Sequence, residues 1–127
     1  MSPAATLWAG RILSLLPVAV LTMSAVMKFV QPAGFADGMT KMGVPMSIVT
    51  ALGVLELACT AIYVFPRTAV LGAILLTGYL GGAVMTHVRI GDPFIVQVLL
   101  GMMLWGGLYF RDARIRALIP LRNQSPV

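Results

Sequence analysis

The stretch that decides the fold is "MGVPMSIVTALGVLELACTAIYVFP", residues 42–66, in which Glu56 is the only charged side chain. An apolar run of this length is typical of a helix that crosses a membrane, which needs about 20 residues. A carboxylate near the middle of such a helix is costly in lipid, so Glu56 requires a partner from elsewhere in the chain. Other helices of the chain must therefore surround Glu56 and supply that partner.

The whole chain has the same apolar character. It has 127 residues, of which 59% are hydrophobic and 10% are charged, whereas soluble domains carry about 25% charged residues. This composition predicts one integral membrane domain over residues 1–127. Nucleic-acid binding is not expected, because the net charge of +5 comes mostly from arginines at the ends of apolar runs. Cys59 is the single cysteine, which excludes an intrachain disulfide and a dithiol reaction within one copy.

Four apolar segments predict an all-α bundle of four transmembrane helices. The expected spans are residues 9–30, 45–65, 67–88 and 93–110. Pro45 and Pro93 fit the first turns of the second and fourth helices, and the fourth is at the short end of the usual range. Arg11 ahead of the first apolar run also resembles the start of a signal peptide, but no clear A-x-A site follows, so the segment is expected to remain as a helix.

The distribution of basic residues predicts the orientation. Four spans place both termini on the same side of the membrane. That side carries Arg11, Arg67, Arg111, Arg114, Arg116 and Arg122. The other side carries Lys28, Lys41 and Arg89. The excess of arginine indicates that both termini, with the tail of residues 111–127, lie in the cytoplasm.

Two segments are expected at the membrane surface. In "QPAGFADGMTKMG", residues 31–43, Phe35 and Met39 recur at helical spacing on the outer side. Gly34 and Gly38 weaken a helix, so a plain loop is the favoured alternative. In "RDARIRALIPLR", residues 111–122, arginines are interspersed with apolar residues and are expected to contact anionic lipid headgroups. A positive-inside anchor with no further role is the simpler alternative.

Small residues predict where helices approach each other closely. The segment "TGYLGGA", residues 77–83, contains a G-x-x-x-G pair formed by Gly78 and Gly82, and Gly81 adds a third small residue. In lipid, such residues let two helix backbones pack together. We expect this contact within the bundle, with a homo-oligomer interface as the alternative.

Six polar side chains fall in the outer half of the predicted bundle or at its midplane. They are Lys28, Glu56, Tyr79, Thr86, His87 and Gln97. At a rise of about 1.5 Å per residue, Glu56 lies about 16 Å and Tyr79 about 15 Å from the outer ends of their helices. The other half has no comparable set, and Tyr63 stands almost alone there.

The direction of the side chains predicts the partners of Glu56. Each Cα–Cβ bond tilts toward the N-terminus of its helix, so Lys28 leans into the membrane and Glu56 leans outward to meet it. Insertion of a charge costs about 2.5–3.5 kcal/mol. Neutralising a carboxyl with an ordinary pKa of about 4.3 costs about 3.7 kcal/mol at pH 7, so the partners decide its state. We expect Glu56 to face the bundle interior, hydrogen-bonded to Tyr79 and in direct or bridged contact with Lys28. It acts either as a clamp between helices or as a site for a proton or a polar ligand.

A resemblance to a known family covers nearly the whole chain. The run "GVLELACTAIYVFPRTAVLGAILLTGYLGGAVMTHVRIGDP", residues 53–93, resembles the central signature of the DoxX-like family, as do "VMKFVQP" (residues 26–32) and "LWGGLYFRD" (residues 104–112). The motif positions that the resemblance implies are Lys28, Pro32, Glu56, Pro66, Arg67, Tyr79, Gly82, Thr86, His87 and Arg89. It implies a small four-helix protein of a bacterial cytoplasmic membrane. Distant relatives serve as a membrane subunit of thiosulfate:quinone oxidoreductases or accompany redox and detoxification enzymes.

Three functions remain open at this point. The first is a non-catalytic accessory subunit whose polar pocket binds a quinone or another amphipathic small molecule, with Lys28, Tyr79 and His87 at its polar head. The second is a small proton-coupled exporter that uses Glu56. The third is a membrane subunit of a quinone-linked oxidoreductase, beside a partner redox enzyme. We expect no metal or haem site, because His87 is the only histidine and the nine methionines show no ligand spacing.

Overall fold

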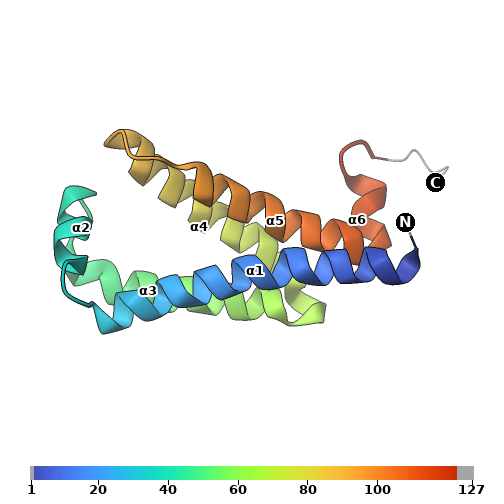
Figure 1. The fold of residues 1–127 in the computed structure, drawn as a ribbon, viewed down its shortest axis with the longest axis horizontal. Coiled ribbons are helices and arrows are strands. Elements are labelled where there is room, and N and C mark those ends of the chain that lie inside the picture. Colours follow the sequence, from blue (N-terminus) through green and yellow to red (C-terminus); the bar gives the residue numbers. More distant parts are fainter. Residues whose placement is uncertain (1, 123–127) are drawn as a thin grey trace.

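The computed structural model describes residues 2–122, which form helices and short connections with no strand among them (Figure 1). The predicted all-helical architecture is confirmed. Positions 123–127 of the predicted tail lie outside the described residues. The elements are α1 (Pro3–Val30), α2 (Phe35–Lys41), α3 (Met46–Val64), the 3-10 turn η1 (Pro66–Thr68), α4 (Ala69–Arg89), α5 (Ile95–Arg111) and α6 (Ala113–Leu118).

Three helical segments are long and apolar enough to cross a membrane. They are Pro3–Val30, Met46–Val64 and Pro66–Arg89, and the shorter Ile95–Arg111 is also apolar. Together with the composition of the chain, they make this a helical membrane protein. Helix α1 begins earlier than the predicted residue 9, because the Ser2 hydroxyl accepts a hydrogen bond from the Ala5 amide at 3.1 Å and Pro3 fits the first turn.

The four longer helices form a bundle in which α1 and α4 occupy opposite corners. Helix α1 packs against α3 and α5, and α4 packs against the same two helices. The beginning of α1 lies beside the end of α5, here called the terminal end of the bundle, whereas α2 covers the other end, here called the α2 end (Figure 1). The turn Pro66–Thr68 reverses the chain between α3 and α4.

Close backbone contacts between these helices occur at glycines. A Cβ atom added at Gly107 of α5 would meet the Ser14 hydroxyl and the Gly10 carbonyl oxygen of α1. One added at Gly72 of α4 would meet the backbone of Tyr63 in α3. The lack of a side chain at these two glycines therefore permits the α1–α5 and α3–α4 contacts, as expected for helices packed in lipid.

The glycines predicted to make such contacts do not make them within the chain. A Cβ atom added at Gly78, Gly81 or Gly82 would meet nothing within 4 Å among its described neighbours. The predicted packing of these three glycines inside the bundle is therefore wrong, because α4 diverges from its neighbours here and leaves open space. Their packing against a second copy remains a prediction.

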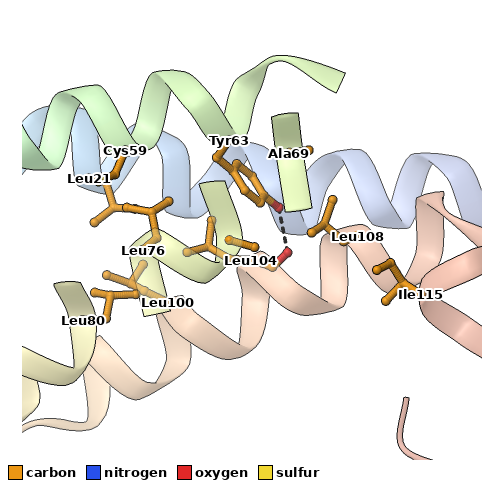
Figure 2. Packing of buried hydrophobic residues seen from close by; sticks show 11 residues of the cluster. Leu21, Cys59, Tyr63, Ala69, Leu76, Leu80, Leu100, Leu104, Leu108 and Ile115 are labelled. Atoms are coloured by element: carbon orange, nitrogen blue, oxygen red, sulfur yellow. Dashed lines mark hydrogen bonds between the residues drawn. The ribbon is translucent and has the colours of Figure 1, made fainter. Parts of the chain in front are cut away.

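Buried apolar side chains run along the axis of the bundle. Leu21, Leu80 and Leu100 lie toward one end of this cluster, and Leu108 and Ile115 lie toward the other (Figure 2). The buried positions on α4, Ala69, Ala73, Leu76 and Leu80, recur every three or four residues and so share one face of the helix. The outward faces carry exposed leucines, valines and methionines, as expected of surfaces that meet lipid.

The segment between α1 and α3 is a helix and not the plain loop that its glycines favour. Helix α2 begins after Gly34, whose φ of 85° is accessible mainly to glycine. Asp37 lies in its first turn and Lys41 in its last, where they complement the helix dipole. The Thr40 hydroxyl adds a hydrogen bond to the Ala36 carbonyl at 2.9 Å. These local contacts compensate for Gly38 within the helix.

A sharp turn at Asp112 separates α5 from α6. The Asp112 carboxylate accepts a hydrogen bond from the Arg114 amide at 2.9 Å, and the Arg114 guanidinium donates to both of its oxygens. These bonds hold the pKa of the Asp112 carboxyl below its usual value. Ile115 is buried in the core cluster and so fixes α6 against the terminal end.

Replacing Gly72 with alanine should destabilise the protein by about 1–3 kcal/mol, because the new methyl group collides with the Tyr63 backbone, which cannot rotate away. Gly81→Ala in the same helix is the matched control, since its methyl group meets nothing within 4 Å. Thermal unfolding of both variants in detergent measures the difference. Equal losses in the two variants would contradict the α3–α4 contact described above.

Candidate functional site

Glu56 lies inside the bundle with only 1% of its surface exposed. It belongs to the buried face of α3, together with Val49, Gly53, Thr60 and Tyr63. Spacings of three and four residues put these side chains on one side of the helix, turned away from lipid. The carboxylate must therefore be solvated by protein groups.

An ion pair with Lys28 supplies the opposite charge. The Lys28 ammonium lies 2.7 Å from Glu56 Oε2 and also donates to the Ser24 hydroxyl at 2.8 Å. A Cβ atom added at Gly53 would lie 3.1 Å from Lys28 Cβ, so the glycine at this position allows α1 to approach α3. This close approach lets the Lys28 side chain reach the Glu56 carboxylate, which lies about one turn further along α3.

A hydrogen bond from Tyr79 completes the arrangement. Its hydroxyl donates to the same Glu56 Oε2 at 2.8 Å. The contacts predicted for Glu56 are thus confirmed, and they join α1, α3 and α4. Both donors converge on one oxygen, and within residues 2–122 no hydrogen bond reaches Oε1. One carboxylate oxygen remains available for a further donor.

Glu56 borders a cavity of about 680 Å³ at the α2 end. Leu21, Leu80 and Leu100, where the buried cluster of Figure 2 ends, line it together with residues of the α2–α3 segment such as Met42 and Val44. The apolar walls are completed by Val20, Met39, Ile48, Leu52 and Val96. A cavity of this size, apolar with a few polar groups, has the character of a small-molecule site.

The other polar residues predicted for a site line the same cavity. Thr86 donates its hydroxyl proton to the Gly82 carbonyl at 2.8 Å. His87 Nδ1 lies 2.7 Å from the Ala83 carbonyl oxygen, which only accepts, so Nδ1 carries the proton in this bond and Nε2 is left for another partner. Gln97 Oε1 is buried with no hydrogen-bond partner among the described residues. All six predicted residues therefore meet at one cavity, and their role in binding or proton handling stays a prediction.

Two of the three glycines discussed above contribute to this space. Gly78 and Gly82 line the cavity beside Tyr79, and Gly81 faces a separate groove. Their lack of side chains keeps the α4 wall open where a larger residue would occupy the cavity.

Polar contacts hold the segment after α2 across the cavity. The Arg89 guanidinium, at the end of α4, donates to the Met42 carbonyl oxygen. Lys41 and Asp92 form a more exposed ion pair at 3.6 Å. Arg89 is a motif position implied by the family resemblance, but its contact with Met42 was not predicted, because it joins residues far apart in the sequence.

A second polar network at the terminal end was missed by sequence reasoning. Tyr63 donates to the Leu104 carbonyl at 2.7 Å, a bond drawn in Figure 2, and so its oxygen accepts from the Ser14 hydroxyl at 2.8 Å. Ser14 in turn accepts from the Arg111 guanidinium at 2.9 Å. This chain of donors links α1, α3 and α5. The G-x-x-x-S spacing of Gly10 and Ser14 was the available signal for a close contact at this point.

Residues able to hold a metal ion do not gather in the described part of the chain, where no three His, Cys, Asp or Glu side chains lie close together. Cys59 is buried in the apolar cluster.

Comparison with known proteins identifies the family. The DoxX-like family matches residues 12–107, which include α1 from its third turn onward and most of α5. The chain belongs to this family. No curated protein and no solved structure matches the chain.

Replacing Lys28 with methionine should destabilise the fold by about 3–5 kcal/mol, because it leaves the Glu56 carboxylate buried without its cation. Glu56→Gln keeps the shape and removes the charge. The double variant Lys28→Met/Glu56→Gln should therefore be more stable than Lys28→Met alone. Unfolding free energies of the four proteins in bicelles measure the coupling, and strictly additive losses would show that the two side chains act independently.

Proposed function

We propose that this protein crosses a bacterial cytoplasmic membrane four times with both termini in the cytoplasm. The 17 residues of α5 span about 26 Å, close to the thickness of the hydrocarbon core. The terminal end carries five arginines, whereas the α2 end carries three basic residues. The five are Arg11, Arg67, Arg111, Arg114 and Arg116, and the three are Lys28, Lys41 and Arg89. The positive-inside rule then assigns the terminal end to the cytoplasm and the short helix α2 to the outer surface, at the membrane interface.

Within that membrane, we propose that the protein is a non-catalytic accessory subunit that binds a quinone-like amphipathic molecule in the cavity at the α2 end. The observation that carries this proposal is Glu56, a buried carboxylate that borders a cavity of about 680 Å³ with one oxygen free of hydrogen bonds. The cavity volume falls within the range of small-molecule sites, about 300–1,000 Å³.

The lining suits a molecule with an apolar body and a polar head. Val20, Ile48 and Leu52 offer flat apolar contact for a ring. Lys28 supplies a hydrogen-bond donor for a ring oxygen, and His87 Nε2 and Glu56 Oε1 supply acceptors for hydroxyl groups. A molecule of this kind dissolves in the bilayer and reaches the site from the membrane.

The terminal end supports binding over exchange across the membrane. Beyond Glu56, the space between the helices is filled by the buried leucine cluster and by the hydrogen bonds among Ser14, Tyr63 and Arg111. An exporter that uses Glu56 has to open this half to the cytoplasm, at the cost of breaking that network. A site that is open toward one side needs no such change.

An accessory subunit also needs surfaces that contact lipid headgroups and partner proteins. The Arg114 side chain is 88% exposed, and α6 presents it beside Arg116 at the terminal end. We propose that this basic surface contacts anionic lipid headgroups, at about 1 kcal/mol for each basic residue near the membrane. A partner redox enzyme, or a second copy of this chain, would use the remaining lipid-facing and loop surfaces.

Glu56→Gln should preserve the fold and weaken hydroquinone binding by at least about tenfold, because a hydrogen bond to a charged group contributes about 1.5–3 kcal/mol. The probe is the reduced, hydroxyl-bearing form of the decyl derivative of dimethoxy-methyl-benzoquinone, titrated into the protein in nanodiscs while tryptophan fluorescence is recorded. Ser14→Ala is the control, since it removes a hydrogen bond at the terminal end and should leave binding unchanged. An unchanged dissociation constant for Glu56→Gln, or an equal loss for Ser14→Ala, would contradict the proposal.

A further inference from the structure

A second hollow lies between α4 and α5. It is an open groove of about 360 Å³ with an almost wholly apolar lining. The residues along it are Thr77, Leu80, Gly81, Val84, Gln97, Val98, Gly101, Met102 and Trp105. Four of them, Thr77, Gly81, Val98 and Met102, are exposed on the surface of the bundle.

The groove adjoins the cavity at the α2 end. Leu80 of α4 and Gln97 of α5 line both spaces, so a molecule in the cavity meets the groove at these two side chains. A chain that leaves the cavity between α4 and α5 would therefore pass these two side chains and enter the groove.

Two glycines on facing helices keep the groove open. A Cβ atom added at Gly81 would meet nothing within 4 Å, and one added at Gly101 would meet only Leu80 Cδ1 at 3.8 Å. Elsewhere on these helices, the space beside Gly72 and Gly107 is filled by the backbone or side chain of a neighbour. Gly81 and Gly101 border unfilled space instead.

Gln97 places an unsatisfied polar atom at the junction. Its Oε1 is buried and has no hydrogen-bond partner among the described residues. A buried acceptor without a donor costs about 1–3 kcal/mol, which a donor from a bound molecule would offset. Glu56 Oε1 also has no hydrogen-bond donor among the described residues. Two acceptor groups on residues that line the cavity can therefore each take a donor from a bound molecule.

We propose that the α4–α5 groove holds the apolar tail of the molecule whose polar head occupies the cavity. This inference rests on the proposed function and names the ligand class more closely. The ligand is a membrane amphiphile with a hydrogen-bonding head and one long unbranched or isoprenoid-like chain. Its head lies between Glu56 and Gln97, and its tail passes Leu80, crosses Gly81 and Gly101, and continues into the lipid.

Groove-filling variants test the path of the tail. Gly101→Leu and Gly81→Leu, on opposite walls, each place a side chain in the groove. Ala58→Leu is the matched control, because it adds similar apolar volume at an exposed position of α3 that lines neither space. The probes are the reduced, hydroxyl-bearing forms of dimethoxy-methyl-benzoquinone without a tail and of its decyl derivative, titrated in nanodiscs of the same lipid.

The measured quantity is the ratio of the two dissociation constants in each protein. Partitioning of a probe into lipid is the same for every variant, so it cancels when these ratios are compared. The tailed probe's advantage should fall by about tenfold in both groove variants and stay unchanged in Ala58→Leu. The affinity of the tailless probe should be unchanged throughout.

A separate variant tests the head contact. Gln97→Leu should weaken both probes in their reduced, hydroxyl-bearing form by roughly threefold to tenfold, the equivalent of one neutral hydrogen bond. If the tailed probe binds both groove variants with the same advantage over the tailless probe as in the unaltered protein, the tail does not lie in the groove, and the proposed function is unaffected. Parallel losses for both probes in the groove variants would also overturn the tail path, since they indicate a collapsed cavity. If neither probe binds the unaltered protein, the proposed function fails and this inference fails with it.

Discussion

The carboxylate of Glu56 has to be solvated by the protein, because lipid and the surrounding leucines offer it no hydrogen bond. Lys28 and Tyr79 meet this requirement from two different helices at 2.7 and 2.8 Å. Their contacts fix the register of α1, α3 and α4 at one depth, since neither α1 nor α4 can slide along α3 without removing a donor. Gly53 makes the α1–α3 approach close enough for Lys28 to reach. The position of the cavity follows from the same contacts, because they hold α4 at the level of Tyr79 while its further turns diverge.

The two halves of the bundle solve the problem of packing in opposite ways. At the terminal end, Gly10, Gly72 and Gly107 let neighbouring backbones touch, and Ser14, Tyr63 and Arg111 satisfy one another's polar groups. At the α2 end, no described neighbour fills the space beside Gly78, Gly81 and Gly82 of α4. The contrast shows that small residues in a membrane helix permit a close contact without requiring one. Whether a glycine brings helices together or leaves room for a ligand depends on what the facing helix presents.

Sequence reasoning located the Glu56 partners because depth and direction follow from simple helix geometry. Counting residues from the helix ends and using the tilt of the Cα–Cβ bond places Lys28 and Tyr79 within reach of Glu56. The packing of Gly78 and Gly82 was predicted wrongly, because a G-x-x-x-G pair contains no information about the opposing surface. The link from Ser14 to Arg111 was missed because a serine in an apolar run has many intrahelical alternatives and its partner lies 97 residues away. Helix α2 was not predicted, because the contacts of Asp37 and Lys41 with the helix dipole and the Thr40 hydrogen bond outweigh its glycines.

Energetics distinguish a structural clamp from a binding site. Replacing a buried ion pair with well-packed apolar side chains is often neutral or stabilising, so Lys28 and Glu56 contribute little net stability that leucines could not supply. A clamp works best when both carboxylate oxygens are bonded and the space around them is filled. Here both donors converge on Oε2, and the carboxylate borders a cavity that is also lined by Gln97, whose buried Oε1 has no partner among the described residues. A carboxylate oriented by two donors on one oxygen is preorganised to accept a third on the other. We therefore interpret the ion pair as the device that positions Glu56 for a ligand, with the linkage of three helices as its structural consequence.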